Sequence, residues 1–167
     1  MPVRSSFWAV VFLVALVAGS LLAQDRTAEL RSRFEKETDP VRKARLVEQL
    51  ADAEFRDMHQ KIDDGNLSDA AEIAGRVRDE AQTGKKALDA KVHDPEARPE
   101  GYKQLEISVR ESVRRLDDIL VGLAKDEQAP LAEVRKDLDE LNRQLIHQLF
   151  PKRPEPAPTT TPEKPKS

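Results

Sequence analysis

Three histidines, His59, His93 and His147, are the side chains of this sequence best suited to proton transfer or metal ligation near neutral pH. There is no cysteine, so disulfides, thiolate zinc sites and cysteine nucleophiles are excluded. A helical bundle can hold a haem iron between a methionine and a histidine, and Met58 with His147 is the pair to consider. If the chain reverses direction at Gly65, Met58 lies about 10 Å and His147 about 26 Å from the same end of the bundle, at about 1.5 Å per helical residue. These two side chains are too far apart to share one iron, so we expect no cofactor.

Catalytic and metal-binding patterns are absent from the sequence. It contains no HExxH, P-loop, GxSxG or GxGxxG pattern. The Glu-x-x-His arrangement of di-iron bundles is also missing, because the residues three positions before the histidines are Arg56, Ala90 and Gln144. Nearly all carboxylates stand beside Lys or Arg on polar helix faces, which is typical of solvated surfaces. We therefore predict a non-enzymatic protein with no catalytic residues and no metal site.

The segment 63–66, Asp-Asp-Gly-Asn, invites comparison with a calcium-binding loop. When Gly65 is placed at the sixth position of such a loop, Ala71 stands at the twelfth, where calcium loops have a bidentate glutamate. We interpret the segment as a solvated turn.

Residues 64–71 resemble the turn between the two helices of a tetratricopeptide repeat, with Ala70 at the small packing position of that repeat. The preceding helix departs from the Trp, Leu, Gly and Tyr of the family at Glu54, Asp57, Met58 and Lys61. No second copy follows at the repeat spacing of about 34 residues, so we do not expect a repeat array. The resemblance implies a helical hairpin, and a concave peptide-binding surface would follow only from a true array.

Residues 1–23 have the pattern of a bacterial signal peptide. Arg4 provides the positive start, and an uninterrupted apolar run spans residues 7–18. Cleavage could follow Ser20 or Ala23, and we favour Ala23 because the sequence becomes polar immediately after it. We therefore expect a periplasmic or secreted protein.

The same segment also bears on two kinds of membrane attachment, lipidation and a membrane-spanning anchor. Gln24 stands where a bacterial lipoprotein has its acylated cysteine, so lipidation at this position is excluded. The alternative to cleavage is a membrane anchor over residues 5–24, which are uncharged and just long enough to span a bilayer.

The mature chain from residue 24 is rich in helix-forming residues, with apolar side chains at steps of three and four and no strand-like alternation. A short helix is predicted over residues 26–38. Asp39 and Pro40 should cap and begin a second helix that continues to about residue 64. Gly65 and Asn66 then predict a tight turn into a third helix.

The third predicted helix contains Thr83-Gly84-Lys85, where glycine weakens the helix by about 1 kcal/mol relative to alanine, so we expect a kink or fray there. Residues 93–101 contain two prolines and should connect a first hairpin (residues 40–92) to a second (residues 102–150). Pro130 should begin the last helix.

These elements predict an all-α fold in which two antiparallel helical hairpins form a four-helix bundle, with a short extra N-terminal helix and a helical domain over residues 24–150. Coiled-coil dimerisation is the alternative architecture. Residues 151–167 are rich in proline and predict a disordered tail. The formal net charge of −3 argues against nucleic acid as a partner.

The sequence favours protein interaction or a structural role in the cell envelope. Ile107, Ile119 and Ile146 lie outside the narrowest apolar stripes of the last two predicted helices, so we predict that they contact an unknown protein partner or a second copy of the chain. The alternatives are a bundle that binds a ligand or metal in its interior and a membrane-tethered spacer whose tail extends toward the cell wall.

Overall fold

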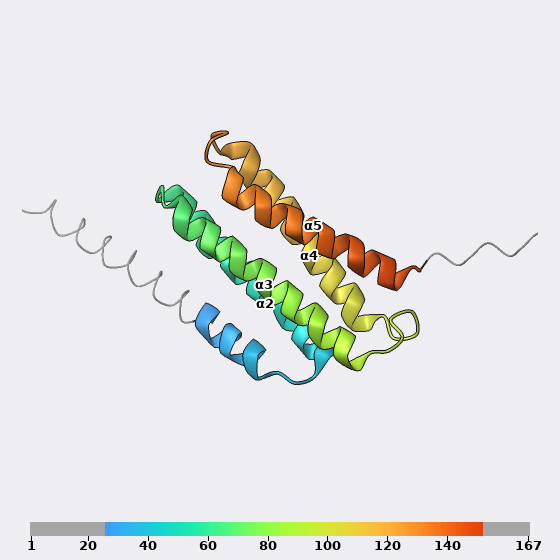
Figure 1. Ribbon diagram of the computed structural model, residues 1–167. Coiled ribbons are helices and arrows are strands. Elements are labelled where there is room, and N and C mark those ends of the chain that lie inside the picture. Colours follow the sequence, from blue (N-terminus) through green and yellow to red (C-terminus); the bar gives the residue numbers. More distant parts are fainter. Residues whose placement is uncertain (1–25, 152–167) are drawn as a thin grey trace, which may run out of the picture.

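The computed structural model describes residues 26–151, so the predicted signal peptide and all of the predicted tail except Pro151 lie outside the described residues. Residues 26–36 are helical and are followed within this range by four longer helices (Figure 1). These are α2 (Pro40–Asp63), α3 (Leu67–Lys91), α4 (Glu100–Gly122) and α5 (Ala129–Leu149). The predicted all-α class is confirmed.

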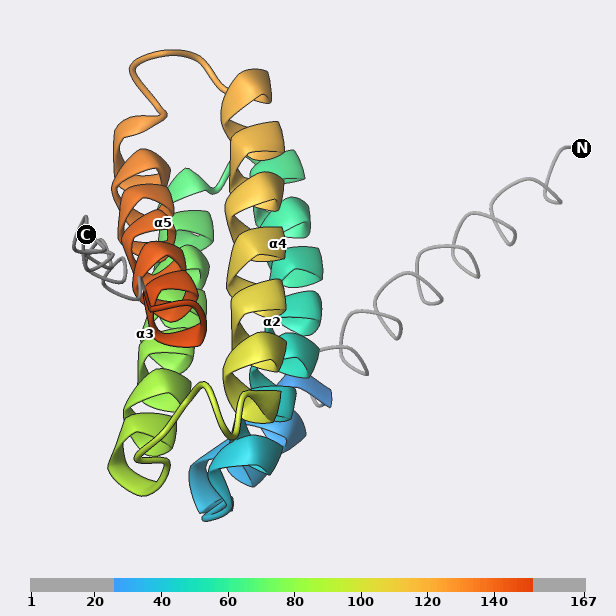
Figure 2. The same cartoon turned by 90° about the vertical axis from the view of Figure 1, so that its right-hand side faces the viewer.

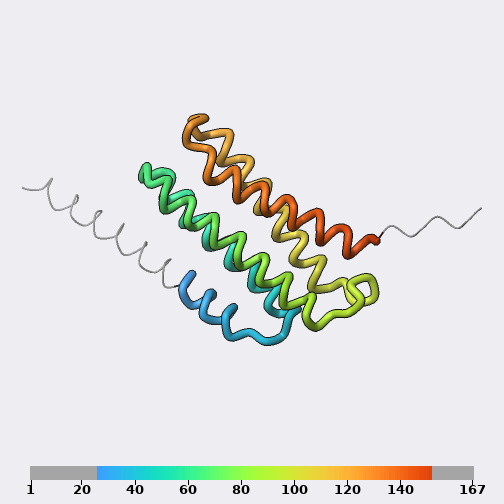
Figure 3. Tube along the Cα trace, in the orientation of Figure 1, coloured from blue at the N-terminus to red at the C-terminus, as the bar shows by residue number. Residues whose placement is uncertain are grey.

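The four long helices form a bundle of two antiparallel hairpins, as predicted. α2 packs against α3, α4 packs against α5, and the hairpins meet mainly through α2 with α4, and to a smaller extent through α3 with both α4 and α5 (Figure 2). The tube view shows residues 26–36 running along the outside of the α2–α3 hairpin, on the side away from α4 and α5 (Figure 3). This short helix is therefore an addition to one hairpin and not a fifth member of the bundle.

Local sequence signals set the start of α2 and the turn between α2 and α3 at the positions predicted from the sequence. The short helix ends at residue 36 instead of 38, and α4 begins at Glu100, inside the predicted connection. The Asp39 carboxylate accepts a hydrogen bond of 2.8 Å from the backbone N–H of Arg42, and Pro40 is the first residue of α2. Gly65 has φ +74°, a left-handed conformation that glycine adopts without steric cost. Asn66 caps α3 by accepting from the backbone N–H of Asp69 at 3.3 Å.

The kink or fray predicted at Gly84 is not found, because α3 runs unbroken from Leu67 to Lys91. A Cβ atom on residue 84 would lie 3.0 Å from Val47 Cγ2 and 3.6 Å from Leu105 Cδ1. The glycine therefore lets α3 approach α2 and α4 closely. Tertiary packing at this crossing outweighs the weak helix propensity of glycine, which sequence alone does not show.

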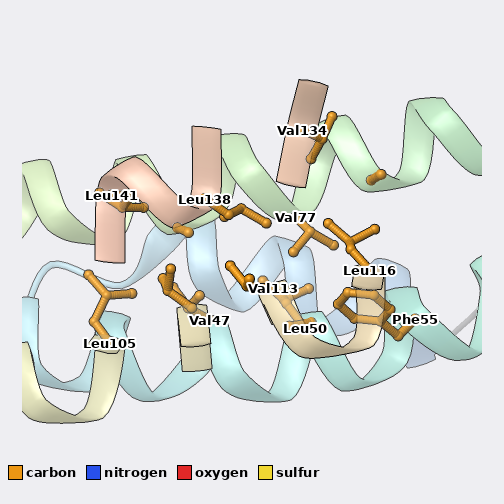
Figure 4. Close-up of a cluster of buried hydrophobic side chains, with 14 of the residues drawn as sticks. Val47, Leu50, Phe55, Val77, Leu105, Val113, Leu116, Val134, Leu138 and Leu141 are labelled. Carbon is orange, nitrogen blue, oxygen red and sulfur yellow. The ribbon is translucent and has the colours of Figure 1, made fainter. Parts of the chain in front are cut away.

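Apolar side chains from all four long helices meet in one core (Figure 4). In α5, the apolar residues that recur at steps of three and four are all buried, namely Leu131, Val134, Leu138, Leu141 and Leu145. The labelled side chains that point toward one another are Val47, Leu50, Phe55, Val77, Leu105, Val113, Leu116, Val134, Leu138 and Leu141. Burying a side chain of this size stabilises the fold by about 1.5–3 kcal/mol, so the core holds the two hairpins together.

Candidate functional site

The three isoleucines predicted to contact a partner lie in two different environments. Ile107 and Ile146 are 47% and 42% exposed, whereas Ile119 is only 6% exposed and belongs to the core. α4 packs against α2, α3 and α5, so it buries a wider face than a single apolar stripe. The structure therefore places Ile119 in the core and not on an accessible surface, which corrects the prediction that it is available to a partner.

Ile107 lies at a groove between α2 and α4 with a volume of about 140 Å³. The groove is lined by Glu48, Ala51 and Asp52 from α2 and by Ile107, Ser108, Glu111, Ser112 and Arg115 from α4. Ile146 lies on α5, which contributes no residue to this groove. The structure therefore brings Ile107 together with polar and small residues of α2 and α4, but not with Ile146.

Three of the residues that line this α2–α4 groove are small and buried. Ala51, Ser108 and Ser112 are each less than 7% exposed. The Ser112 hydroxyl donates to the backbone carbonyl of Ser108 at 2.9 Å. The Ser108 hydroxyl, by contrast, is buried without a hydrogen-bond partner in the described part of the chain. An unpaired buried hydroxyl costs about 1–3 kcal/mol.

Charged side chains surround the groove and leave it acidic. Arg115 pairs with Asp52 at 2.7 Å and with Glu111 at 3.5 Å, and its guanidinium lies 5.3 Å from the centre of the Phe55 ring. Glu48 accepts a hydrogen bond from Gln104. Three carboxylates thus line the groove against one guanidinium, which favours a positively charged ligand segment.

A second unusual feature is a buried charge cluster beneath the helix of residues 26–36, which we call the Glu54–Glu80 cluster. Glu54 on α2 is fully buried and Glu80 on α3 is 9% exposed. Arg31 from the short helix bonds both carboxylates, at 2.5 Å to Glu54 and 3.3 Å to Glu80. Arg76 reaches the same Glu54 oxygen at 3.3 Å, while the other Glu54 oxygen, Oε2, is buried without a partner among the described residues.

Both carboxyl groups of this cluster hold protons more tightly than ordinary glutamates. Burial raises the pKa of Glu54, against the opposing effect of Arg31 and Arg76. Burial and the nearby Glu54 carboxylate together raise the pKa of Glu80 to about 7, although Arg31 opposes the change. The cluster therefore binds a proton in the neutral range.

The histidines do not form a metal site with one another in the described residues. His93 and His147 are exposed and line a hollow of about 570 Å³ at the end of the bundle, and His59 is exposed on α2. Met58 is fully buried, so it does not share a site with the exposed His147. Across residues 26–151, no group of three or more His, Cys, Asp or Glu side chains could hold a metal ion.

The sequence analysis did not identify the Glu54–Glu80 cluster, although part of its signal is present in the helical pattern. Glu54 lies three residues after Ala51 and four before Met58, on the apolar stripe of α2. Glu80 has the same spacing from Val77 and Gly84 in α3. A carboxylate on an apolar stripe indicates a buried charge, but its partner Arg31 is 23 residues from Glu54 and is found only in the folded structure.

No family model, no curated protein and no solved structure matches this chain. Among the described helices, none has the length and apolar character needed to cross a membrane.

Proposed function

We propose that this chain is an exported, non-enzymatic helical bundle that binds a protein partner through the α2–α4 groove. The observation that carries the proposal is the half-exposed Ile107 in a groove lined by three carboxylates, those of Glu48, Asp52 and Glu111. An apolar contact and charged groups around it are thus available side by side, as in protein interfaces with an apolar centre and a polar rim.

The chemistry of the groove indicates the kind of partner. Its carboxylates, Glu48, Asp52 and Glu111, outnumber its single guanidinium, Arg115. We expect a protein segment that places an apolar side chain against Ile107 and carries Lys or Arg beside it. Opposite charges around an apolar contact speed association and select the partner.

Export is proposed from residues 1–23 alone, which lie outside the described residues. Three features of this segment support removal of a signal peptide and release into the periplasm or the medium. They are the positive charge near the start, the short apolar run and the change to polar residues at Gln24. Mass spectrometry of the protein from its native cell should find a mature N-terminus at Gln24. A chain that retains Met1 or Pro2 would contradict cleavage and support membrane attachment.

Site-specific photocrosslinking in the native cell tests the groove. A photoreactive amino acid is placed at Ile107 and, as the matched control, at Ile146, which is the same residue type with nearly the same exposure. We expect a crosslinked partner from position 107 and little or none from position 146. The adduct from position 107 should disappear in the Glu48→Lys, Glu111→Lys double variant, because the acidic character of the groove is lost.

Three outcomes would contradict the proposal. Equal adducts from positions 107 and 146 would mean that the groove is not selective. An adduct with a second copy of this chain, or with its own residues 152–167, would replace the proposed occupant. An unchanged adduct in the double variant would exclude recognition by the groove carboxylates.

A further inference from the structure

Three hollows follow one another along the seam between α3 and α5, which lie side by side (Figure 2). Their volumes are about 360, 420 and 570 Å³. Gln144 lines the first and second hollows, and Gln148 lines the second and third, so the three adjoin one another. We call this surface the α3–α5 groove, which extends from Gln82 and Asp137, past Lys85 and Arg143, to Asp94 and Pro151.

The last described residue, Pro151, lines the hollow at the open end of this groove. Residues 152–158 therefore start beside the groove, at a local concentration on the order of millimolar. A few exposed ion pairs, each of them weak, are then enough to hold these residues there. The α2–α4 groove has no such advantage, because α5 contributes no residue to it.

The length of this segment matches the length of the groove. Three of the seven residues 152–158 are proline, a composition typical of extended polyproline II chains. At about 3.1 Å per residue, the segment reaches about 22 Å from Pro151. The helix from Pro151 back to Asp137 spans about 21 Å at about 1.5 Å per residue.

The first two residues of the segment, Lys152 and Arg153, are complementary to the open end of the groove. Among the described residues, neither lysine nor arginine lines this hollow. Three carboxylates line it, those of Asp89, Asp94 and Glu96. Asp89 is already bonded to Lys85 at 2.6 Å, but the hollow remains a favourable place for two further positive charges.

Glu155 is complementary to the middle of the groove. It is four residues after Pro151, which corresponds to about 12 Å in an extended chain. Arg143 is eight residues before Pro151, which corresponds to the same distance of about 12 Å along the helix. Arg143 and Lys85 line this hollow with a single carboxylate, that of Glu140. The order of charges in the segment thus matches the order of charges along the groove.

We propose that residues 152–158 bind in the α3–α5 groove of their own chain, running back along α5 from Pro151 toward Asp137. Lys152 and Arg153 then lie against the carboxylates of the open end, and Glu155 pairs with Arg143. The α3–α5 and α2–α4 grooves share no lining residue, so the second groove remains open to a partner.

A spin label on the full chain tests this arrangement. The chain has no cysteine, so Ala157→Cys gives a single labelling position. In the proposed arrangement position 157 lies about 19 Å from Pro151, close to Glu140 of α5. We expect the label to broaden the amide signal of Glu140 more strongly than that of Glu111, which is at a similar height on the antiparallel helix α4.

Charge reversal tests the pairing of Glu155 with Arg143. Arg143→Glu should weaken docking about fivefold and reduce the broadening at Glu140, and Glu155→Arg added to it should restore the broadening. Arg110→Glu on α4 is the matched control and should change nothing. Arg110 and Arg143 are 58% and 62% exposed, and each pairs with an acidic residue four positions before it.

Four results would overturn the proposal. Equal broadening of Glu140 and Glu111 would mean that the segment is not held in the α3–α5 groove, and broadening centred on Glu111 would place it in the α2–α4 groove. Broadening at Glu140 that is unchanged in Arg143→Glu would exclude the ion pair. Broadening of Glu140 by a label on a second, isotopically silent copy would show that another chain supplies these residues.

Discussion

The hydroxyl of Tyr102, near the start of α4, donates a 2.9 Å hydrogen bond to Asp89, near the end of α3. Tyr102 is 1% exposed, and Gln148 of α5 donates to the same Asp89 oxygen at 3.1 Å. Lys85 bonds the other oxygen at 2.6 Å. One carboxylate thus ties together three helices next to the loop that joins the two hairpins.

Replacing this tyrosine should destabilise the bundle with little change in packing. We expect Tyr102→Phe to lower the free energy of unfolding by about 1–3 kcal/mol, because it removes one hydrogen bond to a charged group and keeps the buried ring. Urea unfolding followed by circular dichroism measures the change. A stability equal to that of the unmodified chain would show that the hydrogen bond contributes nothing.

The contribution of the Asp89 carboxylate to folding stability should change with pH in the opposite direction to that of Glu80. Burial alone would raise the pKa of Asp89, but the hydrogen bonds from Lys85, Tyr102 and Gln148 outweigh it and lower the pKa. A carboxylate whose pKa is lowered in the folded state stabilises that state above its ordinary pKa of 3.8. This stabilisation is lost as the pH falls through the lower pKa of the folded state. The stability difference between the unmodified chain and Asp89→Asn should therefore shrink below about pH 4. A difference that is constant from pH 7 to pH 3 would contradict this assignment.

Two glycines of α3 provide a matched pair for testing the close helix crossing. Gly84→Leu should destabilise the protein by about 1–3 kcal/mol, because its Cβ alone would lie 3.0 Å from Val47. At Gly75 a Cβ would meet nothing within 4 Å, so Gly75→Leu should be neutral or stabilising by up to about 1 kcal/mol. Thermal unfolding of the two variants gives the comparison. Equal changes in stability in the two variants would mean that helix propensity, and not the close packing of α3 against α2, determines the effect of substitution at position 84.

Ile119 is buried and Ile107 is half exposed, so substitutions at these two positions should distinguish an effect on folding from an effect on partner binding. Ile119→Lys places a charge in the core and should cost about 3–5 kcal/mol of stability or prevent folding. Ile107→Lys is half exposed and should change stability by less than about 0.5 kcal/mol. Chemical denaturation measures both. A large loss of stability in Ile107→Lys would make it unsuitable for testing partner binding and would show that the groove edge is part of the core.

Local signals in the sequence determined the secondary structure of this protein. The caps at Asp39 and Asn66 and the turn at Gly65 depend on residues within one helical turn of each other. The apolar spacing of the last helix is likewise a local pattern, so its buried face from Leu131 onward was predictable. With short loops between the helices, these elements also determined the two hairpins and their antiparallel bundle.

Only the tertiary structure decided which side chains of similar type were buried and which were exposed. Ile119 and Ile107 are both isoleucines on α4, but their exposure depends on where α2, α3 and α5 pack around that helix. Gly84 weakens a helix when considered alone, yet at the crossing with α2 and α4 a Cβ at this position would lie only 3.0 Å from Val47 Cγ2, so glycine gives the closer approach. The Glu54–Glu80 cluster depends on Arg31, which is 23 and 49 residues away from its two partners. Contacts at such separations are set by the packing of whole helices, and the sequence pattern of any single helix does not contain them.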